Sequence, residues 1–307
     1  LEPFTQLPAG AVMSTDVKYY FTKDNDIFSL YRVGETTPYH TVSLSDRSCK
    51  FVGNGSDYYA IYNSDECRIY RTQDASLVRT ITAGEHSSLF ILNDHVTEEI
   101  WGDESLIRIY SLYNPDIVYE LTSQQFDTVC QELLLSESTP YYALFNANDG
   151  IIHIRNFEDA SVDHTLYTNM RTINHYTFSD DGKYLFVEHL DKKIEIYETQ
   201  TGVLAKTLYD VQLSVKNAEY AESLGIYFVY GQYTAKQFCL NENLEIVTDL
   251  PTLFQYDEDS NTLICTYGSN YYRQNFYSYE ELIRIVDETL GDYEPSDEIR
   301  QKHNIIN

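Results

Sequence analysis

The sequence predicts an all-β protein built from seven repeated units. Residues 177–209 show the unit most clearly, with apolar runs at 184–187, 194–197 and 203–208 that are joined by short polar turns. The residue equivalent to Tyr197 returns at intervals of about 40 residues, at Tyr31, Tyr70, Tyr110, Arg155, Cys239 and Phe276. The last apolar residue of the third run repeats in step, at Leu44, Ile81, Leu121, Leu166, Leu208 and Leu250. Four-stranded propeller blades recur at this length, so we predict a seven-bladed β-propeller.

Each unit also contains a middle strand and a polar turn after it. The middle strands are expected at 19–21, 58–61, 99–101, 141–144, 184–187, 226–229 and 262–265. Turns such as Asp24-Asn25-Asp26 and Ser64-Asp65-Glu66 supply residues that tolerate the backbone conformations of tight hairpins. The third strands carry apolar residues on both faces, as at Ile194, Ile196 and Tyr197. This pattern predicts sheets that are covered on both faces by neighbouring blades.

Residues 177–209 resemble one repeat of the WD40 β-propeller family. Tyr197-Glu198 stands where that family has Trp-Asp, and Asp191 stands where it has a turn aspartate. The resemblance extends over residues 1–278, although no unit keeps the Trp-Asp pair itself. It implies that Tyr197 is buried between blades and that Asp191 caps its own turn. It also implies that the loops joining one blade to the next form the face that binds partners.

The seventh unit lacks a fourth strand, and the N-terminal segment is the candidate to supply it. Strands are expected at 253–256, 262–265 and 271–276, and residues 1–7 are the available segment to close this blade. We therefore predict a propeller domain over residues 1–278. After Ser278, the apolar stripe of Leu282, Ile285, Val286 and Leu290 predicts a short C-terminal α-helical extension over residues 279–307, packed on the propeller.

The 279–307 segment resembles the helical tails of bacterial WD40-repeat proteins. That resemblance implies a module within a larger signalling or defence protein. The chain begins at Leu1 without a methionine or a signal peptide, so we expect a preceding segment, which could anchor the protein. Five cysteines without a C-x-x-C pair favour thiols in a reducing compartment, and hence a cytoplasmic location.

Charge narrows the range of partners. The chain carries 48 acidic and 21 basic residues, for a formal net charge of −27. Nucleic acid and anionic membrane surfaces are thereby excluded as expected partners, because phosphate binding requires clustered Lys and Arg. No apolar run is long enough to span a bilayer. The 29 tyrosines recur at structural positions, which favours a core role over an aromatic carbohydrate platform.

No motif indicates a cofactor, a metal or a catalytic residue. His153, His164 and His175 fall in different registers of the repeat, and no His pair has metal-ligand spacing. Nucleotide-binding and hydrolase motifs are absent from the sequence. Because acidic residues are numerous, a carboxylate-dependent glycoside hydrolase or lyase acting in the central channel stays open as an alternative.

Ring side chains in polar inter-blade segments are the candidate binding residues. They are His86, Phe126, Tyr167 and Tyr209. Aromatic residues among polar neighbours suit interface anchors, although ordinary loop residues that pack against a strand would give the same pattern. We therefore predict a protein-binding or sensing module that contacts another protein or another domain of its own chain. A structural assembly scaffold is the second alternative.

Overall fold

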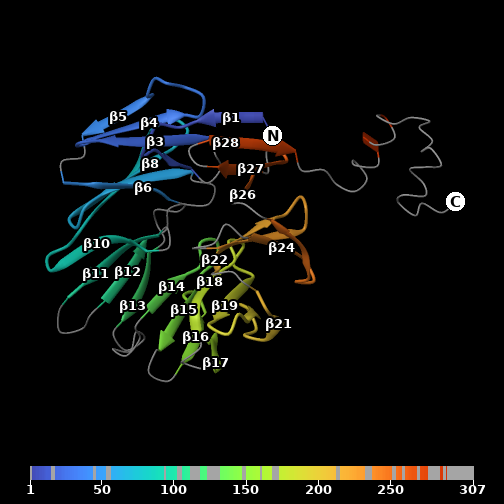
Figure 1. The fold of residues 1–307 in the computed structure, drawn as a ribbon. Coiled ribbons are helices and arrows are strands. Elements are labelled where there is room, and N and C mark those ends of the chain that lie inside the picture. The colour runs from blue at the N-terminus through green and yellow to red at the C-terminus, as the bar shows by residue number, and fades with distance from the viewer. Residues whose placement is uncertain are drawn as a thin grey trace, which may run out of the picture.

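The chain forms a seven-bladed propeller in which every blade is a four-stranded antiparallel sheet (Figure 1). The computed structural model describes residues 2–14, 18–43, 46–52, 57–92, 95–101, 106–110, 118–122, 132–146, 150–159, 161–167, 173–211, 215–231, 237–250, 254–257, 260–267, 270–275, 284–285 and 288. The predicted tail lies outside these residues except for Arg284, Ile285 and Glu288.

Within each blade, strands follow one another from the central axis outward. Blades 1 to 4 comprise β2 (Val12–Met13), β3 (Tyr19–Asp24), β4 (Ile27–Arg32) and β5 (His40–Ser43); β6 (Ser48–Val52), β7 (Tyr58–Tyr62), β8 (Glu66–Arg71) and β9 (Leu77–Thr82); β10 (Ser87–Leu92), β11 (His95–Ile100), β12 (Leu106–Tyr110) and β13 (Val118–Thr122); and β14 (Glu132–Leu135), β15 (Tyr141–Asn146), β16 (Ile151–Asn156) and β17 (Asp163–Tyr167).

Blades 5 to 7 repeat the arrangement, with one difference in the last. They comprise β18 (Ile173–Phe178), β19 (Tyr184–His189), β20 (Ile194–Glu198) and β21 (Leu204–Leu208); β22 (Val215–Ala221), β23 (Ile226–Gly231), β24 (Gln237–Asn241) and β25 (Ile246–Leu250); and β26 (Phe254–Asp257), β27 (Thr262–Tyr267), β28 (Asn270–Asn275) and β1 (Glu2–Gln6). The fourth strand of blade 7 is thus the first strand of the chain.

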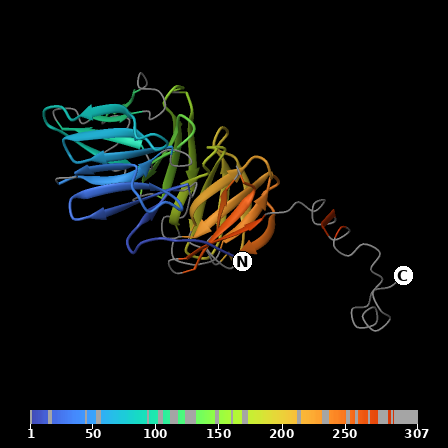
Figure 2. The same cartoon turned by 90° about the horizontal axis from the view of Figure 1, so that it is seen from above.

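The N-terminal strand closes the ring. β1 pairs antiparallel with β28, with Glu2 opposite Arg273 and Gln6 opposite Asn270. Figures 1 and 2 both show the blue N-terminal strand lying beside the orange strands of the last blade. Leu7, directly after β1, is buried. The first and last strands of the chain, β1 and β28, therefore share one sheet. β1 covers the edge of β28 that would otherwise face solvent unpaired.

The hydrophobic core lies between blades. Within the described residues, each cluster of buried side chains combines residues of two consecutive blades, from blades 1 and 2 to blades 6 and 7. The cluster between blades 5 and 6, for example, contains Phe186 and Ile196 from one blade and Tyr227 and Leu240 from the next. Burying such side chains contributes about 1.5–3 kcal/mol each, so neighbouring blades stabilise one another.

Predicted positions in the repeat were wrong in three blades. In blade 7 the equivalent of Tyr197 is Gln274 and not Phe276, because Leu263 pairs with Gln274. The middle strand of blade 3 is β11, so that Trp101 lies beyond its end instead of within it. Thr97 and Glu98 are buried polar residues there and break the apolar pattern on which the prediction relied. In blade 6, the equivalent of Tyr197 is Leu240 and not Cys239, because Tyr227 pairs with Leu240 as Leu185 pairs with Tyr197. Three consecutive buried residues in β24 hid this register in the sequence.

Tyr197 takes the structural position expected of it, whereas Asp191 does not cap its turn. The Tyr197 ring is buried, and its hydroxyl donates to Glu195 Oε2 at 2.9 Å. Within the described residues no hydrogen bond involves the Asp191 carboxylate. The turn is closed by its backbone instead, with Lys192 N donating to His189 O at 3.0 Å. Lys192 adopts a φ of 66°, which completes the tight reversal.

A carboxylate fastens blade 5 to blade 6. Asp180 follows β18, and its Oδ1 accepts hydrogen bonds from Tyr220 N at 2.7 Å and Asp181 N at 2.8 Å. Its own backbone N donates to Ala218 O at 2.9 Å. Asp180 therefore satisfies hydrogen-bonding groups of the β22 backbone, on the side of that strand that pairs with no other strand. Burial raises the pKa of its carboxyl to about 6, and the adjacent Asp181 adds to this effect.

Blade 4 joins the same contact through a glycine. Gly182 has a φ of 69°, and a Cβ at this position would collide with Thr139. The Ser138 hydroxyl donates to the backbone oxygen of Asp180. A side chain at residue 182 would thus both strain the turn and separate two blades.

Removing residues 1–7 should lower the melting temperature by several degrees, because blade 7 loses its outer strand and the ring opens. Differential scanning calorimetry would measure this. Replacing residues 1–7 with a Gly/Ser segment of equal length should have nearly the same effect, since chain length alone does not restore the apolar contact of Leu7. An unchanged melting temperature in both variants would contradict the role of β1.

Tyr197→Ala should destabilise the protein by about 3 kcal/mol, as expected for truncating a buried aromatic side chain. Tyr197→Phe should cost about 1 kcal/mol, because it removes only the hydrogen bond to Glu195. Urea unfolding would give both values. A loss below about 1 kcal/mol for the alanine variant would show that the ring contributes little to packing between blades.

Asp180→Asn should stabilise the protein at pH 8 and have little effect at pH 4. The folded-state pKa of Asp180 is raised above its usual value of 3.8, so the ionised carboxylate is disfavoured in the folded state. Wild-type protein therefore gains stability as pH falls through about 6 and has the full gain below about 4. At pH 8 the free energy of unfolding of the variant should exceed that of the wild type by about 2 kcal/mol. This value is smaller than the full pKa shift implies, because Asp180 is partly exposed to solvent. Asp191→Asn, in an exposed turn, is the control, and a pH-independent difference for Asp180→Asn would contradict the prediction.

Candidate functional site

The candidate site is the face of the propeller formed by the connections between blades and by the turns between the second and third strands. We call this the inter-blade face. Backbone hydrogen bonds tie the two sets of loops together. Val211 N donates to Lys192 O at 3.0 Å, and Ala83 N donates to Asp65 O at 2.8 Å. Side chains that project from these loops are therefore held on a framework that is continuous with the sheets.

Two of the predicted anchors are strongly exposed tyrosines on this face. Tyr167 is the last residue of β17, and 82% of its surface is exposed. Tyr209 directly follows β21 and is 72% exposed. They are the most exposed of the large hydrophobic side chains among the described residues. The two connections are consecutive, since one leads from blade 4 to blade 5 and the other from blade 5 to blade 6.

Leu190 extends this apolar surface, although the sequence reasoning did not select it. It lies in the turn between β19 and β20 and is 63% exposed. The hydrogen bond from Val211 N to Lys192 O joins its turn to the loop of Tyr209. An apolar residue in an otherwise charged turn, Leu190-Asp191-Lys192-Lys193, was the available signal.

The third anchor, His86, belongs to a separate exposed spot on blade 3. His86 is exposed and adopts a φ of 63°. Trp101 donates its backbone N–H to His86 O at 2.9 Å, and its side chain is 49% exposed. Trp101 is the single tryptophan of the chain, and sequence reasoning missed it because a strand was expected at its position. Phe126, the fourth predicted anchor, lies outside the described residues.

A buried glutamate positions the loop that carries His86. Glu98 Oε1 accepts hydrogen bonds from Gly84 N at 2.9 Å and from the Ser87 hydroxyl at 2.6 Å. Its Oε2 accepts one from the Tyr110 hydroxyl at 2.6 Å. Burial alone would raise the pKa of Glu98, but these hydrogen bonds and the nearby Arg108 together lower it below the usual value. Glu98 is therefore held as an anion that organises the loop.

Glu188 has the corresponding role between blades 5 and 6. Its Oε2 accepts a hydrogen bond from Val215 N at 2.7 Å, at the start of β22. Its Oε1 accepts one from the Asn174 side chain at 2.7 Å. The carboxylate thus spans the inner strands of two blades, close to the connection that presents Tyr209. Both buried glutamates are occupied by contacts that hold the loops in place.

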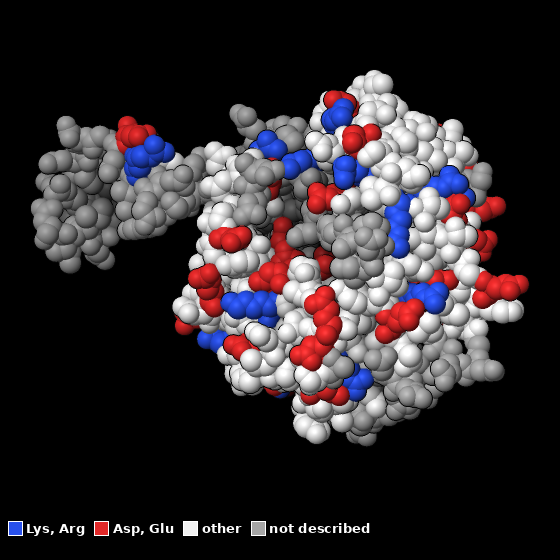
Figure 3. All heavy atoms as spheres, turned by 180° about the vertical axis from the view of Figure 1, so that it is seen from behind, with Lys and Arg blue, Asp and Glu red and all other residues white. Residues whose placement is uncertain are grey.

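Acidic side chains also gather in a recess near the middle of the ring (Figure 3). A general acid in a glycosidase needs a carboxyl group with a raised pKa. The pKa of Glu98 is lowered, whereas that of Asp180 is raised, but the Asp180 carboxylate accepts two backbone hydrogen bonds at the boundary of blades 5 and 6. Among the described residues, no group of three or more His, Cys, Asp or Glu side chains is arranged to hold a metal ion. Cys49, Cys67, Cys239 and Cys265 remain as thiols, whereas Cys130 lies outside the described residues.

No helix in the described part of the chain is long and apolar enough to cross a membrane. No protein-family profile matches the sequence, and no curated protein matches it.

Solved structures resemble the chain in fold. Hsv2 of Kluyveromyces lactis, with its loop 6CD replaced by a Gly-Ser linker, is 12% identical with a TM-score of 0.55, and the match covers 88% of this chain and 94% of that one. The β-propeller domain of Cps50 (Swd1) from Myceliophteria thermophila is 9% identical with a TM-score of 0.54, covering 90% and 99%. A chain of the Mitotic Checkpoint Complex is 11% identical with a TM-score of 0.55, covering 90% and 92%. The protein is a seven-bladed propeller with WD40-like structural neighbours.

Proposed function

We propose that this propeller is a protein-binding module whose inter-blade face docks a partner through Tyr167 and Tyr209. The supporting observation is the exposure of these two rings, 82% and 72%, on consecutive connections of one face. Tyrosine is enriched among the residues that dominate binding energy in protein interfaces, because its ring buries a large area and its hydroxyl tolerates water. Leu190 adds apolar surface beside Tyr209.

The net charge favours a partner with a basic surface. A charge of −27 attracts such a surface over long range and speeds the encounter, whereas the aromatic anchors set the lifetime of the complex. The partner is another protein or another domain of the full-length chain. Membership of a multi-chain assembly, as in the Mitotic Checkpoint Complex chain that it resembles in fold, is compatible with this role.

Domain organisation is part of the same proposal. We further propose that the propeller domain spans residues 1–278 and that residues 279–307 are a helical extension of it. The resemblance of this segment to the tails of bacterial WD40-repeat proteins supports a module within a larger signalling or defence protein. His86 and Phe126 are proposed as further contacts on the same face.

A Tyr167→Ser/Tyr209→Ser double variant should lose most of the partner protein that the wild type retains in a pull-down from lysate of the source cells. Removing two anchors should reduce affinity by a factor of ten or more, since each interface hot spot contributes at least about 2 kcal/mol. Retention by the wild type should also decrease at high salt.

The control is Ile246→Ser/Val247→Ser, which changes exposed apolar residues of the outer strand β25 instead of the inter-blade face. This variant should retain the partner as the wild type does. If the tyrosine variant recovers the same partners with the same yield, the inter-blade face is not the binding site. Cleavage of a polysaccharide by the purified wild type would favour the hydrolase instead.

A further inference from the structure

A histidine nitrogen without a partner lies in the boundary between blades 1 and 2. His40 begins β5, and its imidazole packs against the Tyr59 and Tyr70 rings of blade 2, with centroids 6.0 and 5.7 Å away. Within the described residues, His40 Nε2 is shielded from solvent and makes no hydrogen bond, and the same holds for the Tyr59 hydroxyl. Burial lowers the pKa of the His40 imidazole below its ordinary value of 6.5. The site therefore favours the neutral form of this side chain.

The charged groups around this cluster have partners other than His40. They are Arg32 and Glu35 on blade 1, and Glu66, Arg68 and Asp74 on blade 2. Arg32 pairs with Glu35 at 4.0 Å, and Arg68 pairs with Glu66 at 2.7 Å. Asp74 accepts hydrogen bonds from the backbone N–H and the hydroxyl of Ser76, at 2.9 and 2.6 Å. Within the described residues no ion pair involves His40, so an imidazolium there would have no counterion.

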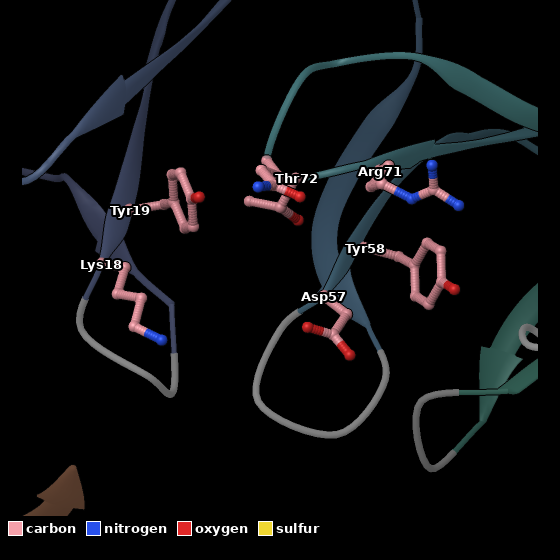
Figure 4. A pocket seen from close by; sticks show the side chains of 7 residues that line it. Lys18, Tyr19, Asp57, Tyr58, Arg71 and Thr72 are labelled. Carbon is pink, nitrogen blue, oxygen red and sulfur yellow. The ribbon is translucent and has the colours of Figure 1, made fainter. Parts of the chain in front are cut away.

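On the face opposite the inter-blade face, a cleft separates blades 1 and 2. Its volume is about 450 Å³. Charged side chains line it, with Lys18 on blade 1 and Asp57 and Arg71 on blade 2 (Figure 4). Water therefore reaches between the two blades on this side of the propeller.

Side chains of blade 1 bridge the boundary next to His40. The Tyr39 hydroxyl, one residue before His40, donates to Thr72 O, and Arg32 Nη2 donates to Gln73 O at 3.4 Å. Both acceptors belong to the connection between β8 and β9. These bonds, together with the packing of His40 on two rings of blade 2, hold the outer part of blade 1 against the next blade.

We propose that His40 makes this boundary sensitive to acid, so that the propeller opens first between blades 1 and 2 when the pH falls. A proton on Nε2 creates a cation that is shielded from water and has no counterion among the described residues. A cation–π contact with the tilted Tyr59 and Tyr70 rings replaces only part of the hydration that the imidazolium loses. Separation of β5 from blade 2 returns the imidazolium to water.

The direction of the pH dependence follows from the lowered pKa of His40. The unfolded chain binds this proton more readily than the folded protein does, because its imidazole is not buried. The contribution of His40 to the free energy of unfolding is therefore complete above a pH of about 6.5 and decreases as the pH falls below that value. Asp180 has the opposite shift. Acid thus strengthens the boundary of blades 5 and 6 and weakens that of blades 1 and 2.

The test compares wild type with His40→Phe and His40→Gln, which remove the titrating group and keep a side chain at the boundary. Urea unfolding of the full chain is measured at pH 8 and pH 5. The unfolding midpoint of the wild type should decrease relative to that of either variant between the two pH values. His86→Gln, which replaces an exposed histidine, is the control and should follow the wild type. If the difference between wild type and both His40 variants is the same at pH 8 and pH 5, the proposal is overturned.

Hydrogen exchange measured by mass spectrometry locates the opening. After correction for intrinsic exchange rates, amides of β4, β5, β7 and β8 in the wild type should exchange at least about threefold faster at pH 5 than at pH 8, whereas those of β22 should not. In His40→Phe this difference should be absent. Loss of protection that is equal in all blades, or that persists in His40→Phe, would overturn the proposal, because acid would then act through other groups.

Discussion

Packing of each blade against its two neighbours is the interaction on which the whole structure depends. The second strands carry buried residues on both faces, and the hydrophobic clusters of the described residues each belong to two blades. A single blade would expose both apolar faces to water, so the blades are stable only as a ring. Pairing of β1 with β28 therefore has consequences beyond one sheet, since it joins the two ends of the ring. The entropy cost of bringing the two ends of the chain together grows only slowly with chain length, so the length of the chain between β1 and β28 adds little to the cost of this pairing.

The acidic composition and the abundance of tyrosine are linked by hydrogen bonds. Buried or half-buried tyrosine hydroxyls repeatedly donate to carboxylates, as in Tyr110–Glu98, Tyr197–Glu195, Tyr227–Asp181 and Tyr230–Glu219. A tyrosine at a core position brings a hydroxyl that must find an acceptor, and a carboxylate forms a stronger hydrogen bond than a neutral group. Part of the excess negative charge is therefore structural. Stacked pairs such as Tyr59 and Tyr70, with ring centroids 5.0 Å apart, supply packing at the position where WD40 repeats have tryptophan.

The two faces of the ring differ in chemistry because different loops form them. The inter-blade face carries exposed rings and an exposed leucine, and buried glutamates fix the backbone of two of its connections. The opposite face carries a polar cleft with charges of both signs. Antiparallel blades place every second connection at the same end, so residues far apart in sequence meet there without any need for a shared strand.

Sequence alone determined the repeat, the number of blades and most of the middle strands, because these follow from local alternation of apolar runs and turn residues. It also indicated Tyr167, Tyr209 and His86 as residues of polar connections. Tertiary structure decided the features that depend on contacts between strands far apart in the sequence. Buried Thr97 and Glu98 look like loop residues in the sequence, since their partners Phe90, Ser87 and Tyr110 come from other strands. Likewise, only packing of blade 1 on blade 2 brings Lys18 into one cleft with Asp57 and Arg71, because about 40 residues separate them along the chain and no local pattern encodes their meeting.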